Sequence, residues 1–271
     1  MTRRLFEYWA ALAAVTACTV LSGPAAAQDV EVDLELVLAV DVSGSMDEGE
    51  RQLQRDGYVQ AFLHPEVIAA ITNGMNGRVA VSYVEWAGPR SQTLVMSWRL
   101  VEGRDSAEAV AAELKQAKSP RIRGTSISAA LAFSGALFED NGFASGRQVI
   151  DISGDGPNNM GPPVLPMREA VLARGITING LPVTLRPTAS FGLPAGLLDI
   201  YYQDCVIGGP GAFFISVQAP EQLADAIRRK LVLEIAGRAP EVVPAQAVQS
   251  PPRIDCLIGE KTRPMWLDEN R

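Results

Sequence analysis

Short apolar stretches alternate along this chain with longer segments whose apolar residues recur at helical spacing. The apolar stretches predict strands. The amphipathic segments, several of them bounded by Pro, Gly, Asp or Ser, predict helices. We expect strands at Leu34–Val40, Val79–Trp86, Gln92–Leu100, Val149–Ser153, Ile176–Leu181 and Phe213–Val217, and helices at Asp47–Leu63, Glu66–Ile71, Asp105–Lys118, Ser126–Phe138, Pro163–Arg174, Ala195–Tyr202 and Pro220–Ile235.

Strands and helices alternate throughout this pattern, apart from one early hairpin at Val79–Leu100. Such alternation predicts an α/β domain, doubly wound, with a mostly parallel sheet and helices on both faces. In these sheets ligands bind beyond the carboxyl ends of the strands, where the winding direction reverses. Each loop that follows a strand is therefore a candidate site, and DVSGS at Asp41–Ser45 is the first such loop.

Residues 1–27 predict a secretory signal peptide. Two arginines, Arg3 and Arg4, precede an apolar stretch from Ala10 to Leu21, and three alanines at 25–27 then offer a cleavage site. The apolar stretch is too short and too rich in Ala for a transmembrane helix.

Two refinements of this signal stay open. TRRLF at Thr2–Phe6 fits a loose twin-arginine export pattern. VTAC at Val15–Cys18 fits a relaxed lipoprotein processing site, which would leave Cys18 as a lipid anchor. Removal of the signal leaves about 240 residues, enough for one well-filled domain.

The end of the chain, 238–271, differs in composition from the alternating middle. RAPEVVPAQAVQSPP predicts an extended, Pro-rich linker. The final RIDCLIGEKTRPMWLDENR is too short to fold alone, and its Cys256 and Trp266 suggest that it docks on the domain. The chain then divides into a signal peptide (1–27), one α/β domain (28–237) and a linker with a docked C-terminal segment (238–271).

Charge and cysteine usage narrow the function classes. The net charge is −7, and basic residues are not interleaved with aromatic ones, which argues against nucleic acid or anionic lipid as a partner. Cys205 and Cys256 are the cysteines outside the signal. In an exported protein one disulfide between them is expected, with two buried free thiols as the alternative. Two cysteines this far apart without a nearby His do not predict a metal site.

Three side-chain oxygens follow the first predicted strand at alternate positions, in Asp41, Ser43 and Ser45. In a tight loop they can surround a single point, and Gly44 lets the backbone turn sharply. One carboxylate and two hydroxyls suit Mg²⁺ or Mn²⁺ rather than zinc or copper. The structural alternative is that Ser45 or Asp47 caps the following helix.

Two further loops carry matching oxygens. Thr125 in RGTSIS stands at the start of a predicted helix, and Asp155 in VIDISGDGPNN ends another strand between two glycines. Each has a structural alternative, because Thr125 can cap its helix and Asp155 can shape a turn. All three loops should lie on one edge of the sheet, where two carboxylates and three hydroxyls approach the six oxygen positions of Mg²⁺.

Together these loops resemble the metal-ion-dependent adhesion site of the von Willebrand factor A domain family, whose motif is D-x-S-x-S, then Thr, then Asp, on separate loops. The order of elements over Asp33–Gly237 fits as well. The resemblance implies a six-stranded sheet with five parallel strands and one antiparallel edge strand. SYVEWAG, DISGDGPNN and the paired cysteines also resemble a group of secreted bacterial A-domain proteins of undefined role. The metal ligands that the family implies are Asp41, Ser43, Ser45, Thr125 and Asp155.

The resemblance also implies a function. Such a site holds Mg²⁺ (or Mn²⁺) and keeps an open coordination position for a carboxylate of a partner protein. Thr125 would bind the ion directly or through water, and the family implies that this choice accompanies partner engagement. We therefore expect a periplasmic or secreted, adhesion-type binding module that is not an enzyme.

Enzymatic alternatives find less support. Phosphatases of the haloacid dehalogenase type carry D-x-D-x-[TV] after the first strand, but Ser43 replaces their second acid, which shuttles protons. The one histidine, His64, precedes a proline at a helix break. G-x-S-x-G, P-loop and dinucleotide-binding patterns do not occur. A metal-assisted phosphoesterase-like hydrolase and a structural A-domain whose cation braces the loops remain as alternatives.

Some other residues have two interpretations each. Trp86 and Trp98 on the hairpin are expected to pack in the core rather than face a ligand. Asn158 and Asn159 either line the partner surface or form a solvated turn. FGLPAGLLDIYYQDC is either an exposed apolar patch for a partner or ordinary core.

Overall fold

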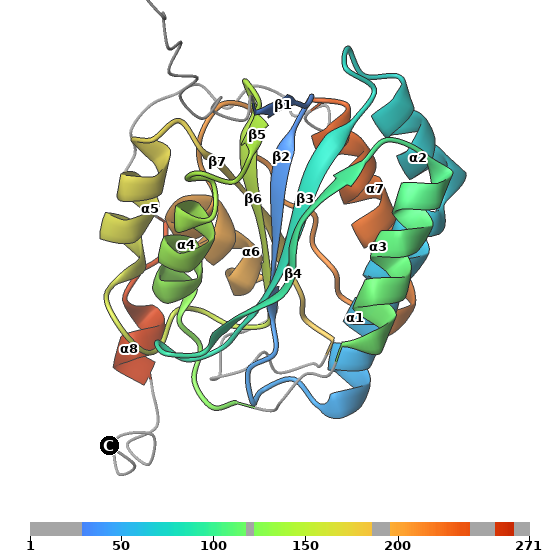
Figure 1. The fold of residues 1–271 in the computed structure, drawn as a ribbon. Coiled ribbons are helices and arrows are strands. Elements are labelled where there is room, and N and C mark those ends of the chain that lie inside the picture. Colours follow the sequence, from blue (N-terminus) through green and yellow to red (C-terminus); the bar gives the residue numbers. More distant parts are fainter. Residues whose placement is uncertain (1–28, 118–121, 186–195, 239–252, 263–271) are drawn as a thin grey trace, which may run out of the picture.

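A five-stranded sheet lies at the centre of the described part of the chain (Figure 1). The structure is a computed structural model and describes residues 29–117, 122–185, 196–238 and 253–262. The strand order is β4–β3–β2–β6–β7, in which β4 is antiparallel to β3 and all other neighbours are parallel. The strands are β2 (Glu35–Asp41), β3 (Val79–Trp86), β4 (Gln92–Val101), β6 (Gln148–Gly154) and β7 (Thr177–Pro182), and β1 (Val30–Glu31) with β5 (Phe143–Ala144) forms a separate parallel pair.

Helices cover both faces of this sheet, so the predicted α/β fold with an antiparallel edge strand is confirmed (Figure 1). One face carries α1 (Glu48–Leu63), α2 (Pro65–Thr72), α3 (Arg104–Gln116) and α7 (Leu223–Ile235), and the other carries α4 (Ile127–Ala136), α5 (Val164–Leu172) and α6 (Leu197–Tyr201). A π-helical turn at Tyr202–Val206 follows α6, a 3-10 turn at Pro220–Gln222 precedes α7, and α8 (Ile258–Thr262) lies near the C-terminus.

The central strand β2 shows why the sheet is buried between two layers. All seven of its residues are buried, as expected for a parallel strand with helices on both sides. Leu36, Leu38 and Val40 belong to one hydrophobic cluster, while Val37 and Ala39 belong to the other. Because successive side chains of a strand point to opposite faces, β2 joins two cores and delivers Asp41 at their common end.

The sixth predicted strand, Phe213–Val217, lies beside β7 but does not form a continuous ladder. Gly180 pairs with Phe214 and Val183 pairs with Val217 as isolated parallel bridges. The Gly180 amide donates to the Phe213 carbonyl at 3.0 Å, and the Thr184 amide donates to that of Val217 at 2.7 Å. The donor between them would be Pro182, which has no N–H, so the ladder is interrupted there.

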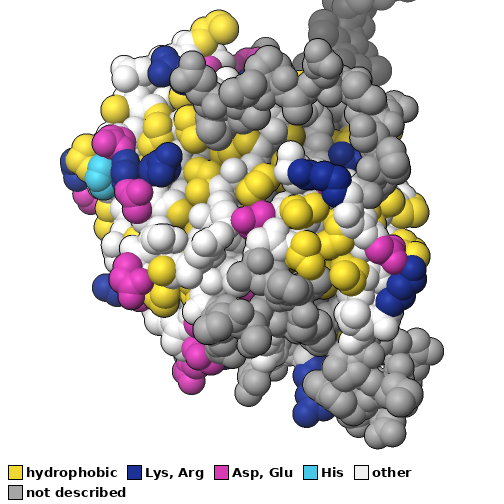
Figure 2. Space-filling model, turned by 180° about the vertical axis from the view of Figure 1, so that it is seen from behind, with side chains coloured by type: hydrophobic (Ala, Val, Ile, Leu, Met, Phe, Trp, Pro, Cys, Tyr) yellow, Lys and Arg dark blue, Asp and Glu magenta, His cyan; other side chains and the backbone are white. Residues whose placement is uncertain are grey.

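Several predictions fall outside the described residues. They are the signal peptide at 1–27 with its twin-arginine and Cys18 alternatives, most of the Pro-rich linker, and Trp266. No helix in the described ranges has the combined length and apolar character that crossing a bilayer requires. On the side seen in Figure 2, acidic, basic and hydrophobic side chains are interspersed, without a gathering of one charge sign.

Candidate metal centre

Asp41 ends β2 as a buried carboxylate with one oxygen left over. Its side chain has 0% exposure, and its Oδ1 accepts the backbone amide of Ser43 at 2.6 Å. Oδ2 has no hydrogen-bond partner in the described structure. The backbone carbonyl accepts Nε2 of the buried Gln54 of α1 at 3.2 Å, which fixes the loop against that helix. A buried carboxylate oxygen without a hydrogen-bond partner is costly, and an ion or a water at that position would satisfy it.

The hydroxyls of the first loop connect it to the loop after β6. Ser43 Oγ and Ser45 Oγ lie 2.9 Å apart, and Ser45 Oγ donates to Asp155 Oδ1 at 2.7 Å. Strands β2 and β6 are parallel neighbours, so Asp41 and Gly154 end at the same edge. The Gly154 position shows how closely the groups approach, because a Cβ there would lie 3.0 Å from Asp41 Oδ2 and 2.9 Å from the hydroxyl of Tyr202.

Thr125 lies on the third loop with its hydroxyl buried and without a hydrogen-bond partner. Its amide donates to Asn159 Oδ1 at 3.0 Å, and its carbonyl accepts the Asn159 amide at 2.9 Å, so it is held to the Asp155 loop. A parallel bridge between Ser43 and Ile122 places the same segment beside the first loop. Ser126, rather than Thr125, caps α4, because its side chain accepts the Ala129 amide.

The loop that follows Ser45 ends in a capping box. The Asp47 side chain accepts the Glu50 amide at 2.9 Å, and the Glu50 side chain accepts the Asp47 amide at 2.8 Å. This arrangement ends the loop at the N-cap Asp47, two residues after Ser45, and starts α1 at Glu48. Asp47, and not Ser45, therefore caps α1, and the Ser45 hydroxyl contacts Asp155. All five predicted ligands lie on these three linked loops; whether they bind a metal is still a prediction.

Electrostatics favour a cation at this point. Burial raises the pKa of Asp41 well above its ordinary value, and the neighbouring Asp155 charge raises it further. The interactions that lower this pKa are hydrogen bonds from Ser43 and from the Asp155 backbone, all of them from neutral groups. A divalent cation would favour the ionised form of both carboxylates.

The chemistry of the donor set selects the kind of ion. Among the described residues no three His, Cys, Asp or Glu side chains cluster as a metal site. The candidate set instead combines two carboxylates with three hydroxyls, and two of its buried oxygens, Asp41 Oδ2 and Thr125 Oγ1, have no hydrogen-bond partner. These residues fit a hard, oxygen-preferring divalent cation.

A second buried charge cluster, which the sequence analysis missed, lies between β6 and α7. Lys230 Nζ is 2.7 Å from Asp151 Oδ1 and also contacts Glu234, and all three side chains are buried. Asn179 Nδ2 donates to Glu234 Oε1 at 2.9 Å. Burial raises the pKa of Glu234 to about 7, and the Asp151 charge adds to this effect. An acid inside the otherwise apolar strand Val149–Ser153 was the signal available in the sequence.

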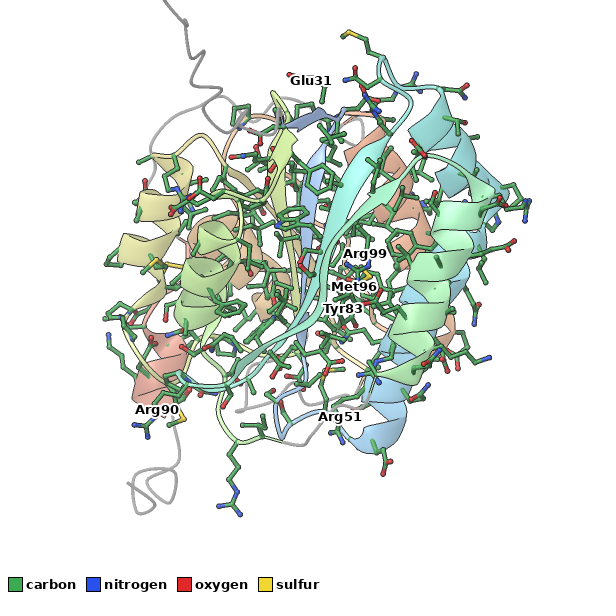
Figure 3. All side chains as sticks on the ribbon, in the orientation of Figure 1. Glu31, Arg51, Tyr83, Arg90, Met96 and Arg99 are labelled. Atoms are coloured by element: carbon green, nitrogen blue, oxygen red, sulfur yellow. A yellow bond between two sulfur atoms is a disulfide. The ribbon has the colours of Figure 1, made fainter. Side chains whose placement is uncertain are left out.

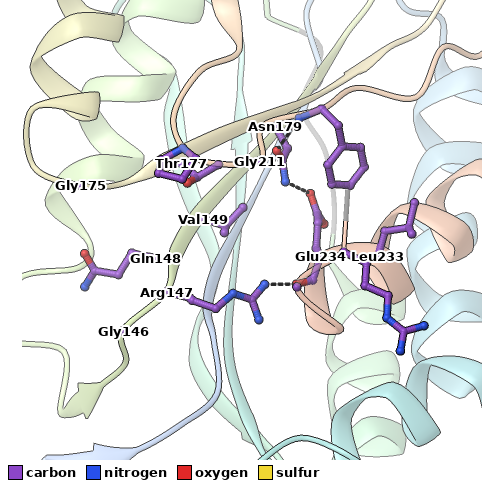
Figure 4. A pocket seen from close by; sticks show the side chains of 14 residues that line it. Gly146, Arg147, Gln148, Val149, Gly175, Thr177, Asn179, Gly211, Leu233 and Glu234 are labelled. Atoms are coloured by element: carbon purple, nitrogen blue, oxygen red, sulfur yellow. Dashed lines mark hydrogen bonds between the residues drawn. The ribbon is translucent and has the colours of Figure 1, made fainter. Parts of the chain in front are cut away.

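Glu234 and Asn179 also line a cavity of about 310 Å³, shown in Figure 4. Other lining residues are Gln148 and Thr177 at the starts of β6 and β7, so the cavity lies at the edge of the sheet opposite Asp41. Arg147 donates there to the carbonyls of Glu234 and Ile235, which satisfies the C-terminal end of α7.

The residues with two interpretations are resolved by burial. Trp86 is fully buried, and Trp98 packs against the core while donating to the Leu137 carbonyl at 2.9 Å. His64 caps α2 by accepting the Glu66 amide at 3.3 Å. Asn158 and Asn159 are 0% exposed, so both the solvated turn and the partner-facing surface were wrong.

The described part of the FGLPAGLLDIYYQDC segment is largely core. Leu198, Tyr201 and Tyr202 are all fully buried. Cys205 forms a disulfide with Cys256, with the two Cα atoms 5.6 Å apart. The expected pairing is therefore present in the structure, and it fastens the C-terminal segment to the domain.

This chain has the von Willebrand factor A fold, as its sheet topology, its helix layers and its D-x-S-x-S loop show. Residues 31–239 match a family model, and the chain belongs to that family, described as "Protein of unknown function (DUF1194)". No curated protein matches the chain.

Solved structures share the fold at low sequence identity. The pilus adhesin SpaC from Lactobacillus rhamnosus GG is similar with a TM-score of 0.55 and 14% identity, over 77% of this chain and 31% of that one. Proximal thread matrix protein 1 from the mussel byssus, in a structure with a zinc-occupied MIDAS motif, is similar with a TM-score of 0.54 and 16% identity, over 78% of this chain and 49% of that one. The chain therefore matches less than half the length of these two proteins.

Proposed function

We propose that this protein is an exported, adhesion-type binding module whose divalent cation coordinates a carboxylate of a partner protein. Mg²⁺ (or Mn²⁺) would be held by the five oxygen-bearing side chains at the ends of β2 and β6 and before α4. One observation carries the proposal: Asp41 is buried beside Asp155, and its Oδ2 has no hydrogen-bond partner. The residues in question are Asp41, Ser43, Ser45, Thr125 and Asp155.

The ligand set explains why an acidic partner would be attracted. Three of the five side chains are neutral hydroxyls, and the other two are carboxylates. The two carboxylates balance the double positive charge of the cation but do not exceed it, so a further carboxylate from a partner is not repelled by net negative charge. A bound cation would supply a Lewis-acidic position for that carboxylate. The partner's Asp or Glu would fill a coordination position that the protein leaves to water.

Basic side chains at the same end of the molecule support an acidic partner. Arg90 is exposed in the loop between β3 and β4, and Figure 3 shows it at the end of the sheet opposite Glu31. Arg123 is exposed two residues before Thr125. The backbone carbonyl of Arg123 would lie 2.8 Å from a Cβ at Gly88, so the two loops that carry Arg90 and Arg123 are in contact. Exposed positive charge near the site would steer an acidic surface toward it.

The similar structures support the same type of function without specifying it. SpaC is a pilus adhesin, and the mussel thread protein has a MIDAS motif with zinc bound. For this chain we propose Mg²⁺ or Mn²⁺ because all five candidate ligands are hard oxygen donors. The disulfide between Cys205 and Cys256 supports a periplasmic or secreted location, since such bonds persist in oxidising compartments.

The proposal is tested by affinity capture with the purified, disulfide-bonded protein from a periplasmic extract. We expect one or more proteins to be retained in the presence of Mg²⁺ and released by EDTA. A Ser43→Ala variant should retain none of them, and free acetate should compete with the partner carboxylate. Retention that is equal in EDTA, or equal for Ser43→Ala, would contradict the proposal.

Experiments on the same purified protein distinguish this proposal from the two alternatives, a metal-assisted hydrolase and a structural A-domain. A metal-assisted hydrolase would turn over a phosphoester in a broad substrate panel with Mg²⁺ or Mn²⁺ present; we propose no enzymatic activity and expect no turnover. A structural A-domain would bind its partner equally with and without cation, while its melting temperature would still rise on cation binding.

A further inference from the structure

The C-terminal segment Arg253–Thr262 lies against the loop that carries Asp155, although the contacting residues Asn158 and Glu260 are 102 positions apart in sequence. The Cys205–Cys256 disulfide joins the segment to the π-helical turn that follows α6, and both cysteines are buried. Arg253 adds a second attachment, because its amide donates to Asp204 Oδ2 at 2.7 Å and its Nη2 to Asp204 Oδ1 at 2.8 Å. The segment is therefore fixed at its start, and α8 is held at a defined place on the domain.

From this anchor α8 reaches the loop that carries Asp155. Glu260 Oε1 accepts Asn158 Nδ2 at 2.7 Å, and the Pro162 carbonyl accepts the same Nδ2 at 3.1 Å. Gly259 lies directly on the same loop, since a Cβ there would be 2.1 Å from the Asn158 carbonyl oxygen and 3.0 Å from Pro157 Cγ. That contact leaves room for glycine alone, so α8 fits this loop closely.

Asn158 is the residue through which this contact reaches the other loops. The side-chain Oδ1 of Asn158 accepts the backbone N–H of Ser128 at 3.1 Å. The backbone N–H of Asn158 donates to the Tyr201 hydroxyl at 3.2 Å. Ser128 lies in the first turn of α4, three residues after Thr125. Asn158 is likewise three residues after Asp155. One buried amide side chain thus ties together the loops of two predicted ligands and α8.

A second path runs through the π-helical turn that contains Cys205. Tyr202 begins this turn, and its buried hydroxyl has no hydrogen-bond partner. That hydroxyl and Asp41 Oδ2 lie within 3.0 Å of the same point above Gly154. The disulfide therefore holds both the turn that places Tyr202 beside Asp41 and the segment that places Glu260 on Asn158.

We propose that Asn158 is a positioning residue of the cation site, and that the disulfide-bonded C-terminal segment sets its orientation through Glu260. This inference rests on the proposed function, because it assumes that the three loops bind a divalent cation. It adds that cation affinity depends on a contact made by the far end of the chain. Loss of the Cys205–Cys256 bond would then weaken the site without changing any of its ligands.

The first test changes the contact and keeps the disulfide. Mn²⁺ affinity is measured by water-proton relaxation on the folded, oxidised full chain for Glu260→Ala, Glu260→Gln and the control Lys261→Ala. Lys261 is an exposed neighbour on α8 that pairs with Asp255. We expect Glu260→Ala to bind Mn²⁺ more weakly, by less than the roughly ten-fold or more that loss of a hydrogen bond made directly to a metal ligand costs, because Asn158 contacts no predicted ligand itself.

The conservative variant separates positioning from charge. Glu260→Gln keeps an oxygen that accepts the Asn158 amide, so it should bind Mn²⁺ nearly as the unchanged chain does, and so should Lys261→Ala. If Glu260→Ala binds Mn²⁺ as tightly as the unchanged chain, the inference is wrong. Equal weakening in Glu260→Gln also overturns it, because the effect would then follow charge rather than position.

The second test removes the disulfide and includes a readout without metal. A Cys205→Ser, Cys256→Ser chain should lose at least as much Mn²⁺ affinity as Glu260→Ala, because the disulfide also holds the turn that carries Tyr202. In EDTA, amide hydrogen exchange at 155–160 should be faster in both variants than in Lys261→Ala. If the double variant fails to fold, the Glu260 series decides alone. If the unchanged chain binds no Mn²⁺, the proposed function is refuted. If the unchanged chain binds Mn²⁺ and the variants bind it equally tightly, only this inference is refuted.

Discussion

Two clusters in this protein each bring a pair of carboxylates together, but they differ in where positive charge comes from. In the cluster between β6 and α7, Asp151 and Glu234 share the ammonium of Lys230. At the edge of the sheet, Asp41 lies beside Asp155, and the groups that lower its pKa are amides and a hydroxyl. The first cluster contains its own cation, so it needs nothing from outside to be stable. For the second we propose that a cation from solution completes it.

The difference shows how burial of charge can distinguish a structural cluster from a binding site. A buried ion pair with good hydrogen bonds fixes the position of a helix, here α7 against β6. A buried carboxylate without a cationic partner retains a cost in the free protein, and binding removes that cost. The following predictions test this distinction, in order of the size of the expected effect.

The largest effect is expected when the internal cation is removed. Lys230→Met leaves Asp151 and Glu234 buried without compensation and should lower the free energy of unfolding by about 3–5 kcal/mol. The measurement is urea denaturation at pH 7. The matched control is Lys261→Met in an ion pair whose lysine side chain is 64% exposed, for which about 0.5 kcal/mol or less is expected. Equal losses in the two variants would refute the structural role of Lys230.

A slightly smaller effect concerns pH. Folding raises the pKa of Glu234 from 4.5 to about 7, so between these values the folded chain keeps a proton that the unfolded chain releases. The contribution of this group to stability is present below about pH 4.5 and is lost as the pH rises to about 7, by up to about 3 kcal/mol. The Glu234→Gln variant should lack this slope in its unfolding free energy. Parallel pH profiles for the two proteins would contradict the assignment.

Replacing the uncompensated carboxylate should have the opposite sign. In EDTA at pH 7, Asp41→Asn removes a buried charge whose pKa is raised by burial and by Asp155. The variant should unfold at a higher urea concentration than the unchanged chain, because the amide leaves no charge to be buried beside Asp155. A clear loss of stability in EDTA would mean that Asp41 is a structural residue.

The smallest effect on folding is expected at Thr125. Its buried hydroxyl has no hydrogen-bond partner, so Thr125→Val should change the metal-free unfolding free energy by about 0.5 kcal/mol or less. Affinity for Mn²⁺ should nevertheless fall if this hydroxyl is a ligand. Ser126→Ala serves as a contrast, because it removes the cap of α4 and should lower stability by about 1 kcal/mol with little effect on Mn²⁺ affinity.

Much of the fold and the outline of the site could be predicted because their signals are local. Strand β3 was predicted with its observed bounds, and the capping box of Asp47 and Glu50 explains why α1 starts where the pattern predicts. The D-x-S-x-S spacing placed three oxygens on one loop. Even the broken sixth strand had a local cause, since Pro182 lacks the N–H that the ladder needs.

The rest could not be predicted because it depends on distant partners. Asn158 and Asn159 follow Gly and Pro and look like a solvated turn, but they are buried by α4 and by α8, which lies about 100 residues further along the chain. Lys230 looks like an ordinary helix surface residue until α7 packs on β6 beside Asp151. Asp151 inside its apolar strand signals a buried acid, but the spacing of nearby residues identifies neither Lys230 nor α8 as the partner.

The most direct test of the central claim is calorimetric titration of the metal-free, disulfide-bonded protein with Mg²⁺ and Mn²⁺. We predict one ion per chain for the unchanged protein and none for Asp41→Asn, which we expect to fold as the unchanged chain does. At 100 times the dissociation constant, the ion should raise the free energy of unfolding by about 2.7 kcal/mol. Absence of binding in the unchanged chain, or equal binding in Asp41→Asn, would contradict the assignment of this site.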